Sequence, residues 1–164
     1  MTHRKLRQKT EAYVREKMSG EVTGHDWFHV DRVRRTALQI AKNEKQPDLL
    51  VIELTALLHD IGDWKVNTSG KSEETVLQET CDMLTYPPEL TEKVLDSILH
   101  MSYGKNIVKK QRLSLEGKIV QDADRLDALG AIGIARAFAY GGKKEREIYN
   151  PEIKPKKVTS LQDY

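Results

Sequence analysis

The sequence predicts an all-α protein, a bundle of about six or seven helices. Across most of the chain, apolar residues recur three or four positions apart, which is the spacing of one buried helical face. Helix-capping residues and glycine or proline breaks separate these stretches, and no two segments read as a pair of strands. With 164 residues, of which 38% are hydrophobic, the chain suits one domain with its own core. We therefore expect a single domain over residues 1–164.

The first half of the chain is expected to form four helices. In the second of them, Val30 and Val33 begin a line of apolar residues along one face. Asp48 and Ser72 are good N-cap residues for the third and fourth helices, and Gly62 allows the chain to turn between them. The expected helices cover residues 4–18, 26–45, 49–61 and 73–84.

The second half is expected to add three more helices. Pro87 and Pro88 make a break before the first of these. The last one is rich in alanine and glycine, so we expect it to pack closely against a neighbour and to end at Gly141 and Gly142. The expected helices cover residues 91–101, 114–127 and 128–140. Residues 143–164 are charged and contain proline, and we expect this tail to lack a helix.

Composition limits the setting and the partners of the protein. The 27 basic and 25 acidic residues give a net charge of +2, which provides no general attraction to nucleic acid or membrane but permits a local pocket for a small anion. The basic tail lacks the interleaved aromatic residues of many nucleic-acid-binding segments, so a nucleic-acid partner is unlikely. Cys81 is the only cysteine, so no intramolecular disulfide can form, and we expect a packed thiol and a cytoplasmic location. No stretch reaches the roughly 18 apolar residues of a membrane span.

Three segments place polar residues on faces that should point inward. They are residues 25–33, 57–63 and 120–130. His29 lies on the apolar line of Val33, His59 follows Ile52 by seven positions, and Asp124 continues an apolar line in its own segment. Burying an unpaired carboxylate costs several kcal/mol, and a shared divalent cation would remove that cost. A hydrogen-bonded core histidine is the alternative reading for each segment taken alone.

Motifs in the same segments resemble a known family. They are His29-x-x-Arg-Val33, Leu58-His-Asp-Ile-Gly62 and Asp122-Ala-Asp-Arg-Leu-Asp127. The order His…His-Asp…Asp resembles the HD superfamily of metal-dependent phosphohydrolases, and the flanking residues resemble its bacterial YedJ-like subgroup from about residue 4 to about residue 153. The resemblance implies an all-helical bundle in which His29, His59, Asp60 and Asp124 hold a divalent metal ion. Nitrogen and oxygen ligands of this kind suit Mn, Fe, Co, Ni or Zn, with Mg less usual, and leave positions for water or a phosphate oxygen.

Residues around the four ligands receive further expected roles. Asp63 and His25 are the expected catalytic residues. Asp63 is the expected general acid or base, with a helix cap or a salt-bridge partner as its alternative. His25 is expected to contact substrate or a second metal ion, with a structural hydrogen bond as its alternative. The expected substrate-binding residues are Arg32, His100, Tyr103, Lys105, Arg125 and Asp127. Among them the guanidinium groups suit phosphate oxygens, whereas Asp127 could instead orient a ligand histidine.

The resemblance favours hydrolysis of a small phosphorylated substrate, either a nucleotide or a phosphomonoester. Two alternatives stay open: a diphosphate hydrolase acting on a signalling nucleotide, and a regulatory module that binds metal and nucleotide without cleaving it. One departure from the subgroup concerns the C-terminus, because its members usually continue with further helices whereas this chain ends in a basic stretch over residues 154–164. We expect missing C-terminal helices to affect the closure of the pocket and any homodimer contact.

Overall fold

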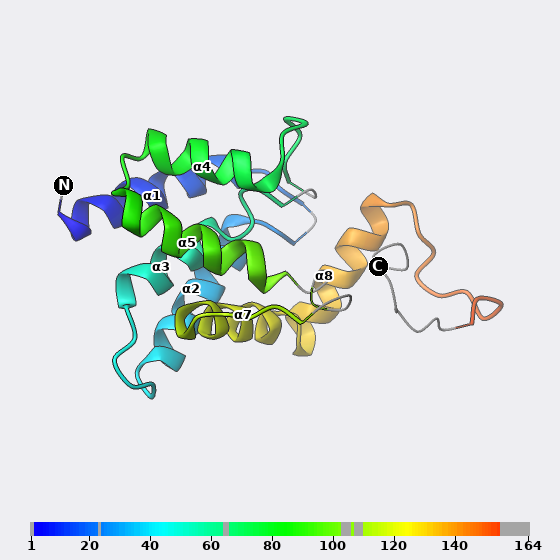
Figure 1. Ribbon diagram of the computed structural model, residues 1–164. Helices are drawn as coiled ribbons and strands as arrows, with labels where there is room; N and C mark the ends of the chain where they lie inside the picture. Colours follow the sequence, from blue (N-terminus) through cyan, green and yellow to red (C-terminus); the bar gives the residue numbers. More distant parts are fainter. Residues whose placement is uncertain (1, 23, 64–65, 103–105, 107–109, 155–164) are drawn as a thin grey trace.

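The computed structural model describes residues 2–22, 24–63, 66–102, 106 and 110–154. Within these ranges it contains seven helices, labelled as in Figure 1, and no strand, which confirms the all-α prediction. The helices are α1 (His3–Lys17), α2 (Trp27–Ala41), α3 (Leu49–Leu58), α4 (Glu73–Met83), α5 (Pro88–Met101), α7 (Leu115–Asp127) and α8 (Gly130–Lys143). None of the helices in this part of the chain combines the length and the apolar character needed to cross a bilayer.

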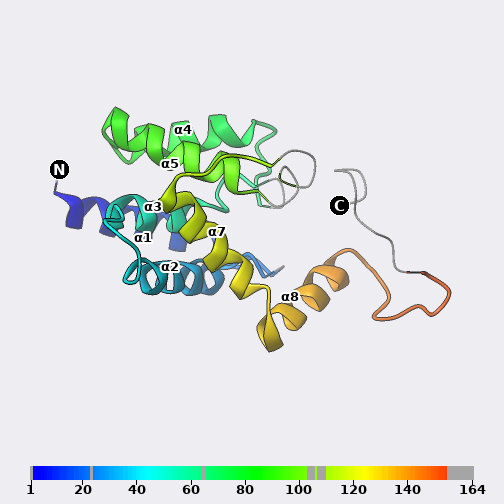
Figure 2. The same cartoon turned by 60° about the horizontal axis from the view of Figure 1, so that its bottom comes forward.

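Helix α3 forms the centre of the bundle. Its residues are apolar on nearly every side, and all of them from Leu50 to Leu58 are buried. A helix of this composition must be covered all round, and α1, α2, α5 and α7 pack against it (Figures 1 and 2). The fully buried Leu54 and Leu57 belong to the larger core cluster, while Ile52 and Ala56 face the smaller cluster between α2 and α7. The end of α3 is therefore held in a fixed position relative to four other helices.

One charged residue lies inside this apolar helix. Glu53 is 6% exposed, and its carboxylate accepts hydrogen bonds from the Arg34 guanidinium, with Nη2 at 2.7 Å and Nε at 2.9 Å. The Nε atom of Arg7 lies 2.7 Å from the same carboxylate. Since an unpaired buried carboxylate is costly, the two arginines neutralise it and join α1 and α2 to α3.

The predicted N-caps are confirmed. The Asp48 carboxylate accepts hydrogen bonds from the backbone N–H groups of Leu50 and Val51, and Ser72 Oγ accepts one from Thr75. These oxygens satisfy N–H groups that have no partner inside the helix.

Several predicted helix ends were wrong. Helix α2 ends at Ala41 rather than at residue 45. Helix α5 begins at Pro88 rather than at residue 91, because proline at the first helical position loses no hydrogen bond that the helix would make. Helix α3 ends at Leu58 rather than at Ile61, so that the residues after it form a turn. Gly62 is buried in this turn, where a Cβ atom would lie 2.9 Å from the carbonyl oxygen of Glu73. Close approach to α4, rather than an unusual backbone angle, therefore requires glycine.

The predicted close packing of the alanine- and glycine-rich helix was also wrong. Helix α8 contains no buried residue, and it extends away from the bundle beyond α7 (Figures 1 and 2). Ile134 and Phe138 are 61% and 50% exposed. Small side chains permit close packing but contribute little apolar area to drive it. The helix also continues through Gly141 and Gly142 to Lys143.

The predicted packed thiol of Cys81 is confirmed, since its side chain is fully buried and unpaired with another cysteine. Burial raises the pKa of this thiol to about 12. Because the thiolate is the reactive form, we expect native protein at pH 8 to resist an aromatic disulfide reagent, and protein unfolded in guanidinium to react with one equivalent. Native protein that reacts as fast as unfolded protein would contradict the buried position.

Candidate metal centre

The four predicted metal ligands come from three helices that pack against one another. His29 lies in the first turn of α2, His59 and Asp60 directly follow α3, and Asp124 lies in the last turn of α7. His29, His59 and Asp60 are buried. The side chain of Asp124 is 38% exposed, so the cluster opens to solvent on the side of α7. Residues up to 95 positions apart in the chain thus converge on one point.

The donor atoms of these residues have the spacing expected around one ion. His29 Nε2 lies 3.2 Å from His59 Nε2, 3.3 Å from Asp60 Oδ2 and 3.4 Å from Asp124 Oδ1. His59 Nε2 lies 3.5 Å from Asp60 Oδ1 and 3.8 Å from Asp124 Oδ1. Metal–ligand bonds of about 2.1 Å put neighbouring donor atoms roughly 3.0–3.5 Å apart. His29, His59 and Asp124 form one group that could hold a divalent cation, and Asp60 joins His29 in a neighbouring group.

Hydrogen bonds fix the orientation of both imidazole rings. His59 Nδ1 lies 2.8 Å from the carbonyl oxygen of Ala56, which can only accept, so Nδ1 carries the proton. His29 Nδ1 likewise donates to Asp127 Oδ2 at 2.7 Å. In their neutral forms the two rings therefore turn unprotonated Nε2 atoms toward each other. Two acceptors at this distance repel unless a proton or a metal ion lies between them, so the pair can bind either one.

The electrostatics of the cluster favour positive charge. Burial would lower the pKa of His29, but the carboxylates of Asp127 and Asp60 raise it to about 9. Burial would raise the pKa of Asp60, but His59 and the hydrogen bonds from His25 and His29 hold it well below its ordinary value. The C-terminal ends of α3 and α7, which carry partial negative charge, also point to this region. A proton or a metal ion is therefore stabilised here.

Asp127 is held behind His29 by two arginines. Arg32 donates to both oxygens of this carboxylate, from Nε at 2.6 Å and from Nη2 at 2.9 Å, and Arg136 Nη1 donates at 3.1 Å. Burial would raise the pKa of Asp127, but His29 and Arg32 hold it well below its ordinary value, and Asp127 in turn raises the pKa of Arg32. This geometry agrees with the orienting role considered for Asp127. Because Arg32 is engaged in this ion pair, its contact with substrate remains a prediction.

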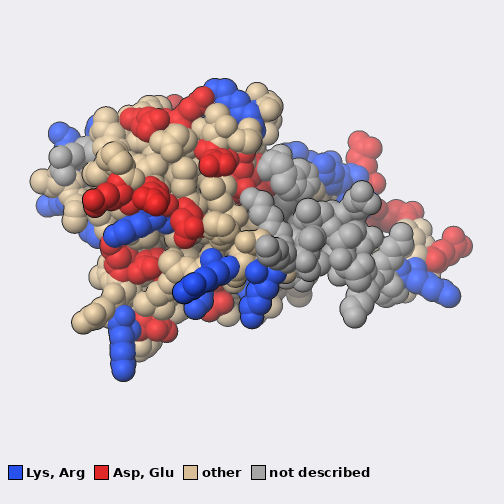
Figure 3. Space-filling view, viewed as in Figure 1, with Lys and Arg blue, Asp and Glu red and all other residues tan. Residues whose placement is uncertain are grey.

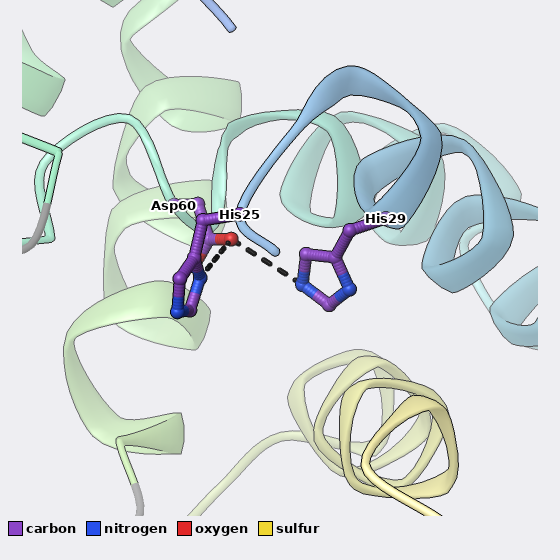
Figure 4. Close-up of side chains that lie close together, drawn as sticks. All are labelled: His25, His29 and Asp60. Carbon is purple, nitrogen blue, oxygen red and sulfur yellow. Dashed lines mark hydrogen bonds and ion pairs between the residues drawn. The ribbon is translucent and has the colours of Figure 1, made fainter. Parts of the chain in front are cut away.

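His25 and Asp63 flank the cluster. Figure 4 shows Asp60 between the rings of His25 and His29, and His25 Nδ1 donates to Asp60 Oδ2 at 2.9 Å. His25, His29 and Asp60 form a second group whose donor atoms could hold a cation. Asp63 is partly buried, and its backbone belongs to the turn after α3, where its N–H donates to the carbonyl oxygen of Asp60 at 3.2 Å. The catalytic roles of His25 and Asp63 stay predictions.

The remaining predicted substrate-binding residues that the structure describes are His100 and Arg125. His100 Nδ1 donates to the backbone carbonyl of Asp96 at 2.8 Å, and its side chain lines a groove of about 450 Å³ between α4 and α5. Glu74, Asp82 and Glu92 line the same groove, and Figure 3 shows acidic side chains gathered over these two helices. Arg125 is exposed on α7. The predictions for Tyr103 and Lys105 lie outside the described residues.

Arg136 was not predicted as part of the site. Its side chain is 17% exposed and reaches the Asp127 carboxylate from α8. One signal was present in the sequence, because Arg136 is the only charged residue between Gly130 and Gly142. A lone arginine in an apolar helix indicates a specific partner, since its charge must be paired where it leaves solvent.

Comparison with known proteins identifies the family of the chain. The HD domain family model matches residues 27–129, which include the four predicted ligands and Asp127. The Bacillus subtilis protein YpgQ is 37% identical over 153 residues, covering 93% of this chain and 74% of YpgQ.

Solved structures with the same fold include YpgQ in complex with ADP, with a TM-score of 0.73 and 34% identity over 99% of this chain and 76% of that one. A Lactobacillus plantarum protein has a TM-score of 0.87 and 35% identity over 100% and 75% of the two chains. An HD-superfamily hydrolase from Bacillus thuringiensis has a TM-score of 0.69 and 39% identity over 94% and 74%. A family model that matches more than half of the sequence, together with these relatives, shows that the chain belongs to the HD domain family.

Proposed function

We propose that the protein is a metal-dependent phosphohydrolase that acts on a small phosphorylated substrate, either a nucleotide or a phosphomonoester. One observation carries the proposal: the Nε2 atoms of His29 and His59 face each other at 3.2 Å beside the carboxylates of Asp60 and Asp124, while both Nδ1 atoms donate elsewhere. Membership of a family that contains HD-superfamily hydrolases supports it. In the proposal His29, His59, Asp60 and Asp124 hold the divalent ion.

The roles of the residues follow from their positions. A divalent ion in this site would polarise a phosphate oxygen and lower the pKa of a water molecule. Asp124 lies on the exposed side of the cluster, where a substrate can approach. His25 donates from Nδ1 to Asp60, which leaves Nε2 as its atom for exchanging a proton with the substrate. Asp63, in the turn after α3, is the second candidate for proton transfer.

A nucleotide is the favoured class of substrate. A crystal structure of YpgQ contains ADP, and the similarity to YpgQ covers 99% of this chain. Arg125 neighbours Asp124 in the sequence and is exposed, so its guanidinium is a candidate for a phosphate contact. The acidic face over α4 and α5 would repel a nucleic-acid backbone, which favours a small substrate.

The test is a hydrolysis screen over nucleoside mono-, di- and triphosphates and generic phosphomonoesters. Metal-free protein is assayed alone and with added Mn²⁺, Co²⁺, Ni²⁺ or Mg²⁺. We expect phosphate or pyrophosphate release that requires one of these ions and stops on chelation. His59→Ala should lose the activity, whereas His3→Ala, which removes an exposed histidine at the start of α1, should retain it.

Two outcomes would overturn the proposal. A protein that binds one equivalent of metal and a nucleotide without turnover would instead be the regulatory binding module. A folded protein that binds no metal ion would exclude both functions at this site.

A further inference from the structure

Helix α8 reaches the metal centre through one partly buried side chain, Arg136. Its residues are otherwise exposed or partly exposed, and its helical neighbour is α7. The side chain of Arg136 is 17% exposed, and its guanidinium donates to Asp127 Oδ2 at 3.1 Å. The same oxygen accepts the hydrogen bond from His29 Nδ1 at 2.7 Å. Arg136 is thus connected to His29, a candidate metal ligand, through Asp127.

The stem of Arg136 also lies against the turn that leads to His25. Gly24 has a φ of +88°, and a Cβ atom at this position would lie 2.7 Å from Arg136 Cγ. Glycine is therefore needed for two reasons, because it adopts the left-handed conformation and leaves room for the arginine stem. Arg136 contacts the segment before His25 with its stem and the carboxylate behind His29 with its head.

We propose that Arg136 is a positioning residue that couples the docking of α8 to metal binding, acting through Asp127 on His29. The inference rests on the proposed metal site and deepens it, since it assigns a control on metal retention to a helix that supplies no predicted ligand. Arg32 holds both oxygens of Asp127 from the side of α2, and Arg136 holds Oδ2 from α8. With both arginines in place the carboxylate is fixed on two sides, and so is the ring of His29.

The loss of Arg136 should change the orientation of the His29 ring, and with it the direction in which Nε2 points. Groups that hydrogen-bond to a ligand histidine fix its tautomer and orientation, and removing them typically lowers metal affinity about 10–100-fold. Without Arg136, Asp127 keeps Arg32 but can rotate about that ion pair, and α8 loses its buried charged contact. Metal retention should therefore weaken even though every predicted ligand remains.

The experiment measures the dissociation constant for Co²⁺ by optical titration of metal-free full-length protein. We expect Arg136→Met to weaken binding about 10-fold or more, and Arg136→Lys to restore part of the loss by keeping the charge. Arg35→Met is the matched control, because Arg35 is an exposed α2 arginine that pairs with Asp31 on the surface. Circular dichroism and the thermal unfolding midpoint verify that each variant is folded.

A double-mutant cycle with Asp127→Asn separates positioning from a general structural effect. If Arg136 acts through Asp127, Arg136→Met should change the Co²⁺ dissociation constant much less in the Asp127→Asn background than in the wild type. Equal losses in both backgrounds, or wild-type affinity in Arg136→Met, would overturn the inference while leaving the metal site intact. Failure of the wild-type protein to bind Co²⁺ would overturn both the inference and the proposed function.

Discussion

Replacing Asp60 with asparagine is expected to prevent stoichiometric binding of a divalent ion and to lower hydrolysis by about 100-fold or more. The substitution keeps the size of the buried side chain but removes its negative charge. Asp60 Oδ2 accepts from His25 Nδ1 and lies 3.3 Å from His29 Nε2, and Oδ1 lies 3.5 Å from His59 Nε2. An asparagine amide can present only one oxygen to these groups, so its NH₂ either opposes the His25 donor or replaces an oxygen beside His59. Metal content after dialysis and the initial rate of phosphate release measure the two effects.

Asp122→Asn is the matched control for this prediction. Asp122 lies two residues before Asp124 on the same helix, but it is exposed. The control makes the same chemical change near the site without altering the cluster, so metal content and rate should stay within about twofold of the wild type. An Asp60→Asn protein that keeps one equivalent of metal and wild-type turnover would show that Asp60 is not a ligand of the ion.

The sequence was sufficient to predict most of this cluster because helical periodicity determines which side chains point inward. His29 shares a face with Val33, and His59 lies near the end of a buried stretch, so both could be assigned to the interior before any contact was known. Periodicity cannot show that the three segments 25–33, 57–63 and 120–130 meet in space. The family resemblance supplied that expectation. The confirmed N-caps at Asp48 and Ser72 have the same local origin, since the capping oxygen and its N–H partners lie within three residues.

The features that were missed depend on contacts between distant segments. Arg136 meets Asp127 and lies against Gly24 only because of the direction in which α8 leaves α7, and no local pattern encodes that direction. Composition was misleading for α8, because alanine and glycine allow a close neighbour without requiring one. The pairing of Glu53 with two arginines was hidden for a similar reason, since its helix is otherwise apolar and its partners lie 19 and 46 positions away.

The largest expected effect on stability comes from α3. Leu54→Ala should lower the free energy of unfolding by about 3 kcal/mol, because Leu54 is fully buried and its loss leaves a cavity among helices that cannot all move inward. For a domain of this size the thermal midpoint should fall by roughly 6–12 °C. Leu49→Ala makes the same change at the start of the same helix, where the side chain is 48% exposed, and should cost less than about 1 kcal/mol.

Urea unfolding of both variants, with and without saturating Co²⁺, separates packing from metal binding. A metal ion that binds only the folded state adds a stability set by its concentration and dissociation constant, so it should raise the midpoints of wild-type and Leu54→Ala protein by similar amounts. If Leu54→Ala and Leu49→Ala were equally destabilised, α3 would not be the centre of the core. If Co²⁺ stabilised the wild type but not Leu54→Ala, the cavity would have displaced His59 and Asp60, which follow this helix directly. The central helix would then determine the geometry of the metal centre as well as the stability of the fold.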